Sequence, residues 1–161
     1  MLATLSRRAI IILLAASLTA SAAFVFAATL PLTDLVIVTA AGARHKFLVE
    51  VADKDETRNQ GLMFRRTLAA DAGMLFAYQQ DSNFAMWLRN TFIPLDMLFI
   101  SSDGKIQKIH QRAVPHDETP IPAPGAVRAV LEVNGGTAAR LGLKVGDRVE
   151  HAVFGKAPAA N

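Results

Sequence analysis

The sequence contains no cysteine. Disulfide bonds therefore cannot stabilise the fold, and a lipid anchor on cysteine and a cysteine nucleophile are both excluded. No Gly-x-Ser-x-Gly segment is present, so a serine triad has no support in the sequence. The four histidines are not spaced like metal ligands and form no HExxH motif: His45, His110, His116 and His151. We therefore expect no metal site and no cofactor.

An excess of charge of one sign is also lacking once the N-terminus is set aside. The chain of 161 residues has a formal net charge of +3, with 17 basic and 14 acidic residues. Two of the basic residues, Arg7 and Arg8, lie within residues 1–27, which hold no acid, so 15 basic residues remain against the 14 acidic ones. Nucleic-acid binding requires a clustered basic surface, and we therefore expect no nucleic-acid partner.

The N-terminus has the pattern of an export signal. Arg7 and Arg8 precede an apolar stretch that carries no charge over residues 9–33. Ala27 and the valine two positions before it fit the small-residue cleavage positions, so we predict that residues 1–27 are a signal peptide cleaved after Ala27. The mature protein would then be periplasmic or secreted. The alternative is an uncleaved N-terminal membrane anchor, because the stretch is nearly long enough to span a bilayer; this would be its only membrane contact.

Alternating hydrophobicity predicts a mainly β domain over residues 28–155. In "HKFLVEV", Phe47, Val49 and Val51 point to one face, which is typical of a half-buried strand. We expect eight short strands, at residues 34–40, 45–51, 73–78, 84–88, 95–101, 105–111, 127–134 and 147–154. Many short strands separated by turn residues predict a compact antiparallel sandwich or small barrel with one or two short helices. The Ala- and Pro-rich residues 156–161 are expected to be a disordered tail.

Two segments have the features of short helices. Asp53 and Glu56 have the spacing of a capping box, which predicts a helix over residues 54–60 that ends at Gly61. Residues 136–142 are predicted to form a second short helix. Neither helix is long enough to change the mainly β fold class.

A polar hinge between two apolar runs is the candidate site. In one interpretation Asn90 and Thr91 stabilise a turn, Asp96 accepts nearby backbone amides, and Trp87 belongs to the core. In the other, Trp87, Arg89 and Asn90 line a ligand cleft, because an aromatic face with amide and guanidinium donors suits sugars or carboxylates. The residues alone leave both interpretations open.

Glu132 is an acid on an otherwise apolar predicted strand. Such a residue either lies near the sheet edge in water or is buried against a basic partner, for which Arg65 and Arg89 are the candidates. Glu132 and Asp96 would form a carboxylate pair for acid–base chemistry if they faced one another. Their separation is not given by the sequence.

The order of several sequence blocks resembles the domain-of-unknown-function 192 family. The blocks are "ETRNQGLMFRRTL", "AGMLFAY", "MWLRNTFIPLDMLFI", "DGKI" and "AVLEVNGG…LGLKVGD", and they span about residues 46–150. The most specific mark is Trp-x-(Lys/Arg)-Asn-Thr-x-Ile-Pro-Leu-Asp. The resemblance implies a compact, mostly β, sandwich-like domain that is often exported in bacteria and has no assigned activity. Arg89 stands where the family commonly has Lys, which weakens any role for an amine at this position.

Positions that match the family pattern include many polar side chains, which favours a site at the hinge. We therefore expect the protein to bind a small polar ligand, a glycan fragment or a carboxylate, near the Trp-Leu-Arg-Asn-Thr hinge. The ligand-binding candidates are Arg65, Trp87, Arg89, Asn90, Thr91, Asp96 and Glu132.

Two other functions stay open at this stage. In one, the protein is a structural or partner-binding module, in which the loop 112–126 with its four prolines, or an exposed sheet edge, docks an envelope protein. In the other, it is a hydrolase or lyase that uses Asp96 and Glu132 as acid and base.

Overall fold

The computed structural model describes residues 30–156. The predicted signal peptide, residues 1–27, and residues 157–161 of the predicted tail lie outside the described residues. Lys156, the first residue of that tail, pairs with His151 in an isolated β-bridge. Within residues 30–156 no helix has the length and apolar character needed to cross a bilayer.

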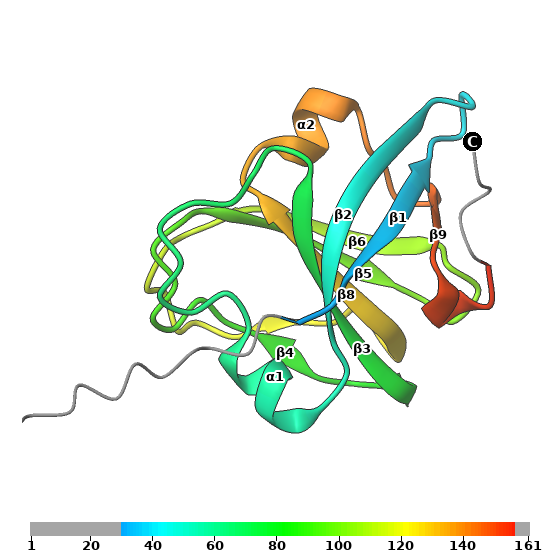
Figure 1. The fold of residues 1–161 in the computed structure, drawn as a ribbon. Helices are drawn as coiled ribbons and strands as arrows, with labels where there is room; N and C mark the ends of the chain where they lie inside the picture. The colour runs from blue at the N-terminus through cyan, green and yellow to red at the C-terminus, as the bar shows by residue number, and fades with distance from the viewer. Residues whose placement is uncertain (1–29, 157–161) are drawn as a thin grey trace, which may run out of the picture.

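Nine strands and two short α-helices make up the described part of the chain (Figure 1). In chain order they are β1 (Leu32–Val38), β2 (Arg44–Ala52), α1 (Asp55–Gln60), β3 (Ala72–Ser82), β4 (Ala85–Met86), β5 (Leu95–Ile100), β6 (Ile106–Ala113), β7 (Ile121–Pro122), β8 (Val127–Asn134), α2 (Thr137–Leu141) and β9 (Arg148–Glu150), followed by the 3₁₀ turn η1 (Ala152–Phe154). The prediction of a mainly β fold with one or two short helices is confirmed.

Seven strands form one curled sheet in the order β6-β5-β8-β3-β2-β1-β9, a half-barrel. Its two edge strands meet at one end, where Lys105 and Arg148 form a β-bridge. The amide of Ile106 donates to the carbonyl of Asp147 at 2.9 Å, and the amide of Val149 donates to the carbonyl of Gly104 at 2.7 Å. Pairing of the two edges removes part of the exposed backbone that an open sheet would present.

One strand pair differs from the antiparallel arrangement that the sequence predicts. β2 and β3 run parallel, with Leu48 opposite Ala72 and Ala52 opposite Phe76. A parallel pair needs a crossover connection, and here α1 and the loop after it carry the chain back to the start of β3. This crossover places α1 beside the sheet, where it becomes one wall of the cavity described below.

The sheet has a hydrophobic core on each face. Side chains from all seven strands fill the inner face; they include Leu35, Phe47, Leu75, Leu98 and Leu131. The outer face of β3, β8 and β5 carries a second core, covered by the small sheet of β4 and β7 and by the loops around them. The second core includes Met74, Phe76, Met86, Leu88, Met97 and Val130.

Local differences from the predicted elements have identifiable causes. Asp53 does not begin the first helix, because Lys54 precedes its first residue and donates its amide to the hydroxyl of Thr57 at 3.2 Å. β4 ends at Met86 rather than at Leu88, whose amide instead donates to the carbonyl of Asp117. The predicted loop 112–126 contains the short strand β7. The last strand is also shorter than predicted, because η1 follows it.

Candidate functional site

The hinge after β4 is a tight turn held mainly by its own backbone. The amide of Thr91 donates to the carbonyl of Leu88 at 3.2 Å, and the Thr91 hydroxyl donates to the carbonyl of Arg89 at 3.3 Å. Asn90 has a φ of 55°, a left-handed conformation that Asn tolerates better than most residues. Its carbonyl accepts the amide of Phe64 at 2.7 Å. Asn90 therefore shapes the turn and joins it to the loop after α1.

Asp96 is a structural acid. Its side chain is fully buried, and Oδ1 accepts the amides of Arg112 at 2.8 Å and Gly136 at 2.9 Å. Oδ2 accepts the amide of Ala138 at 2.8 Å. The carboxylate thus joins β5 to the end of β6 and to the start of α2.

Asp96 and Glu132 lie on opposite faces of the curled sheet. Asp96 alternates with Met97, whose side chain belongs to the outer core, whereas Glu132 alternates with Leu131 and Val133 of the inner core. Successive side chains of a strand point to opposite faces, so Asp96 faces inward and Glu132 outward. The acid–base pair considered from the sequence is therefore separated by the sheet itself.

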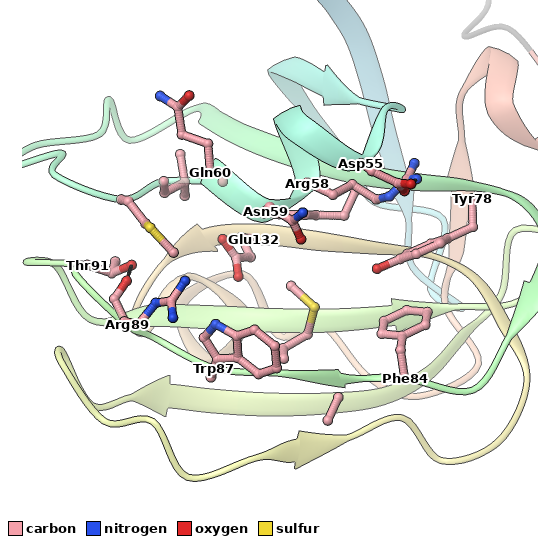
Figure 2. A pocket seen from close by; sticks show the side chains of 16 residues that line it. Asp55, Arg58, Asn59, Gln60, Tyr78, Phe84, Trp87, Arg89, Thr91 and Glu132 are labelled. Carbon is pink, nitrogen blue, oxygen red and sulfur yellow. Dashed lines mark hydrogen bonds and ion pairs between the residues drawn. The ribbon is translucent and has the colours of Figure 1, made fainter. Parts of the chain in front are cut away.

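A cavity of about 260 Å³ lies on the outer face, between α1 and the segment around Trp87 (Figure 2). Its lining comes from α1 and the residues just after it, from β3 and β8, and from the chain around β4. The residues are Asp55, Arg58, Asn59, Gln60, Gly61, Leu62, Met63, Phe76, Tyr78, Phe84, Ala85, Met86, Trp87, Arg89, Thr91 and Glu132. Of the seven candidates from the sequence, this cavity brings together Trp87, Arg89, Thr91 and Glu132.

Glu132 is a buried acid that lines this cavity. It lies on β8 between Met74 of β3 and Met97 of β5, and its side chain is only 4% exposed. Figure 2 shows its carboxyl group pointing into the space between α1 and the Trp87 segment. Within residues 30–156 the carboxyl group has no hydrogen-bond or ion-pair partner, whereas Arg65 is paired with Glu50. Burial raises the pKa of Glu132 to about 8.

Neither arginine that the sequence suggests as a partner forms an ion pair with Glu132. Arg65 binds Glu50 with both of its terminal nitrogens, at 2.5 and 2.7 Å, and does not line the cavity. Arg89 does line the cavity, and its guanidinium group makes no ion pair within the described part of the chain. Arg89 is therefore the cavity cation that remains available to a ligand.

The second cavity arginine is already committed. Arg58 forms an ion pair with Asp55 one turn earlier in α1, and its Nη1 donates to the carbonyl of Ala77 at 2.8 Å. Its guanidinium carbon also lies 4.8 Å from the ring centre of Tyr78. Arg58 thus fixes α1 against β3 and helps to set the shape of the cavity.

Aromatic side chains form the remaining wall. Tyr78 and Phe84 stack with ring centres 4.3 Å apart, and burial raises the pKa of the Tyr78 hydroxyl. Trp87 is 48% exposed at the cavity, so it does not belong to the core. The chain has a single Trp and a single Tyr, and the cavity uses both. Their rarity, with Tyr78 directly before the polar run "QQDSN", is the signal by which the sequence could have indicated Tyr78.

Two other surface features lie near the hinge. Phe64, which is 64% exposed, lies 6.5 Å from Phe92, and Arg66 and His116 both approach the Phe92 ring. A second cavity of about 300 Å³ lies between β6 and the Pro-rich loop. Lys108, which lines this second cavity, donates a hydrogen bond to the carbonyl of Pro122 at 2.6 Å. Neither feature includes His45, whose Nε2 atom is buried without a hydrogen-bond partner in the described part of the chain.

The comparisons with known proteins extend over most of the chain. The model of the domain-of-unknown-function 192 family (DUF192, "Uncharacterized ACR") matches residues 36–151. A structure from Sinorhizobium meliloti 1021, described as a "putative transcription regulator", is 46% identical, with a TM-score of 0.76 over 78% of this chain and 97% of that one. A protein of unknown function from Novosphingobium aromaticivorans DSM 12444 is 43% identical, with a TM-score of 0.75 over 78% and 89% of the two chains. No curated protein matches significantly.

Proposed function

The chain belongs to the DUF192 family, and we propose that this member is an exported domain that binds a small polar ligand, a saccharide fragment or a carboxylate, in the cavity between α1 and Trp87. The single observation that carries the proposal is the Glu132 carboxyl group, which is buried, without a partner in the described structure, and directed into a cavity. Buried polar side chains normally have hydrogen-bond partners, and a group without one in a cavity is suited to a ligand.

The chemistry of the lining fits ligands of this class. Trp87 offers a half-exposed aromatic face on which the apolar side of a sugar ring can pack. Arg89 offers a fork of N–H donors that matches a carboxylate. Apolar walls with a few polar groups that fix orientation are typical of small-molecule sites. The volume of about 260 Å³ is just below the usual range of about 300–1,000 Å³, which favours a small ligand.

Export is the second part of the proposal. It is supported by the basic start, the uncharged apolar stretch and the small residues before Ala28, all of which precede the first described residue. Expression of the full chain in a Gram-negative host, followed by fractionation and N-terminal sequencing, tests it. We expect a periplasmic protein that begins at Ala28. A full-length protein in the membrane fraction would instead identify an uncleaved anchor.

A nucleic-acid-binding function has less support. The description of the Sinorhizobium meliloti relative concerns transcription, but the balance of 15 basic and 14 acidic residues in 28–161 gives no general attraction to phosphates. Of the two arginines that line the cavity, Arg58 is already paired with Asp55, so it offers no free charge to a phosphate. Small-molecule binding is therefore the better-supported proposal.

Trp87 supplies a direct test of binding because it is the only tryptophan in the chain. The processed protein is titrated with neutral sugars, sugar acids and small organic acids while Trp87 fluorescence and the melting temperature are followed. A ligand at about 100 times its dissociation constant stabilises the folded state by about 2.7 kcal/mol. We expect at least one member of the panel to change both signals.

The control uses two matched arginine variants. Arg89→Gln removes the available cation of the cavity, whereas Arg66→Gln makes the same change on an exposed arginine outside the lining. Ligand binding should weaken at least tenfold in the first and persist in the second. If no member of the panel binds, or if both variants bind like the wild type, the cavity is not the site.

A further inference from the structure

Resting on the proposed function, we infer that the ligand is an anion that presents a carboxylate to Arg89 and to the protonated carboxyl group of Glu132, with a sugar ring against Trp87: a sugar acid of the hexuronate type. This inference selects one class from the ligands that the cavity accommodates. It also assigns Glu132 the role of a hydrogen-bond donor.

The surroundings of Glu132 favour its neutral form. Its neighbours across the sheet are the apolar side chains of Met74 and Met97, and its own side chain is almost fully buried. A buried carboxyl group loses solvation when it ionises, and within the described residues no ion pair offsets that loss for Glu132. The pKa of about 8 agrees with this geometry, so Glu132 carries a proton at neutral pH and can donate it in a hydrogen bond.

The charges that face the cavity leave a positive balance. From α1, Asp55 and Arg58 form an ion pair and offset one another. From β3, Tyr78 is neutral, because its pKa is raised from an already high value. From β8, Glu132 is neutral, so Arg89 from the hinge is the uncompensated charge of the lining. The cavity therefore favours an anion and disfavours an amine.

A ligand carboxylate can bind both the Glu132 carboxyl group and the Arg89 guanidinium group, and no charge in the cavity is then left without a partner. The Glu132 O–H donates to one ligand oxygen, and Arg89 donates N–H groups to the carboxylate; both are charge-assisted hydrogen bonds. The figure places Glu132 and Arg89 on the same cavity, with Trp87 beside them (Figure 2). An amine ligand would require ionised Glu132 and would also be repelled by Arg89.

Protonation of Glu132 gives the binding a defined pH dependence. When the pH rises above about 8, Glu132 loses its proton and repels the ligand carboxylate. Apparent affinity falls with the fraction of protein that is competent to bind, so it should drop on the order of 30-fold between pH 7 and pH 9.5. The ligand carboxylate itself stays ionised throughout this range.

The test compares three sugars that share a ring and differ at one substituent. Glucuronate, glucose and glucosamine, with galacturonate and galactose as a second matched series, are titrated against the processed protein by calorimetry and Trp87 fluorescence at pH 6, 7 and 9.5. We expect a hexuronate to bind more tightly than its neutral counterpart, and glucosamine not to bind. The affinity of the wild type for the hexuronate should fall at pH 9.5.

The Glu132→Gln variant tests whether Glu132 acts as a neutral hydrogen-bond donor or as a charged acid. The amide keeps a donor and cannot ionise, so this variant should bind the hexuronate at pH 7 and keep its affinity at pH 9.5. Glu132→Met fills the site with the same side chain as its two sheet neighbours and should lose binding while remaining folded. Arg66→Gln serves as the control for the effect of pH on the rest of the protein.

The outcomes distinguish this inference from the function on which it rests. If a neutral sugar or glucosamine binds best, if wild-type affinity is unchanged or rises with pH, or if Glu132→Gln abolishes binding, Glu132 is not a neutral donor and the inference is overturned. Ligand binding in the cavity would still stand in those cases. If no sugar and no organic acid binds at any pH, the inference and the proposed function both fail.

Discussion

Asp96 shows how one side chain can hold three segments together. Its two oxygens accept three backbone amides, one from the end of β6 and two from the start of α2. Asp96→Ala leaves these buried donors unsatisfied, and each such donor costs about 1–3 kcal/mol. We expect the free energy of unfolding to fall by about 3 kcal/mol or more, as measured by urea denaturation.

Asp34→Ala is the matched control for this change, because Asp34 is an exposed acid on β1. Its removal should alter stability by less than about 0.5 kcal/mol. Asp96→Asn should be intermediate and should still bind ligand, because Asp96 lies on the face of the sheet away from the cavity. Loss of binding in a stably folded Asp96→Asn protein would contradict the separation of the two acids.

Glu132 makes stability depend on pH in a direction that differs from that of a salt-bridged acid. Its pKa is raised from 4.5 to about 8 in the folded state, so the folded protein binds a proton that the unfolded chain has released. Stability from this group is complete below pH 4.5 and falls as the pH rises to about 8. Glu132→Gln removes this loss. We expect its stability advantage over the wild type to grow between pH 4.5 and pH 8 and then to level off.

Denaturation curves at pH 4, 6, 8 and 9 measure this difference for the two proteins. Subtracting the wild-type free energy of unfolding from that of the variant cancels the contributions of other titrating groups. One of these is His151, whose pKa is lowered by burial, so that its contribution to stability rises with pH. A constant difference across the series would mean that Glu132 is ionised and solvated in the folded protein.

At the scale of elements, the hinge is a turn whose backbone conformation matters more than its amide side chain. Asn90 has a positive φ and is exposed, and its side chain does not line the cavity. Ala at this position should lower stability by about 1 kcal/mol, whereas Gly should leave it nearly unchanged, because glycine adopts this region freely. Thermal unfolding of Asn90→Ala and Asn90→Gly tests this, and both should keep ligand binding.

The result for Asn90 also separates the two interpretations of the hinge. If Asn90→Gly is as stable as the wild type and loses ligand binding, the amide contacts the ligand and the turn interpretation is incomplete. If binding persists, the motif residues divide into Asn90, which sets the turn, and Trp87 and Arg89, which the turn presents to the cavity.

The elements that the sequence predicts well are those whose pattern depends on local contacts. The alternation in β2 and the apolar runs of β5 and β8 predict strands that the structure contains. The parallel pairing of β2 and β3 could not be predicted, because it depends on the path of the chain between them. The short strand β7 was hidden by its proline, which is tolerated because the two-stranded sheet leaves free edges.

The candidate site was also predictable only in part, because the sequence shows which polar residues are present but not which partners the fold gives them. Trp87, Arg89 and Glu132 are unusual in their local sequence, and they meet in the cavity. Arg65 and Asp96 are equally unusual, but their charges are used by Glu50 and by backbone amides that lie far away in the sequence. Only the fold decides which polar side chains are left without a partner.

At the scale of the whole molecule, the curled sheet depends on contact between its two edges near Gly104. A Cβ atom at Gly104 would lie 2.6 Å from the carbonyl oxygen of Val149, and the φ of Gly104 is 81°. Gly104→Ala therefore combines backbone strain with a clash at the closure. We expect a loss of about 2–4 kcal/mol in the free energy of unfolding.

Gly42 provides a matched control for this closure. It has a similar φ of 85°, and a Cβ atom there would have no other atom within 4 Å. Gly42→Ala carries the backbone strain without the clash and should cost only about 1 kcal/mol. Urea denaturation of the two variants isolates the contribution of edge contact, because the strain is common to both. Equal losses would show that the two edges can separate at little cost, and that the inner core alone holds the sheet in its curled form.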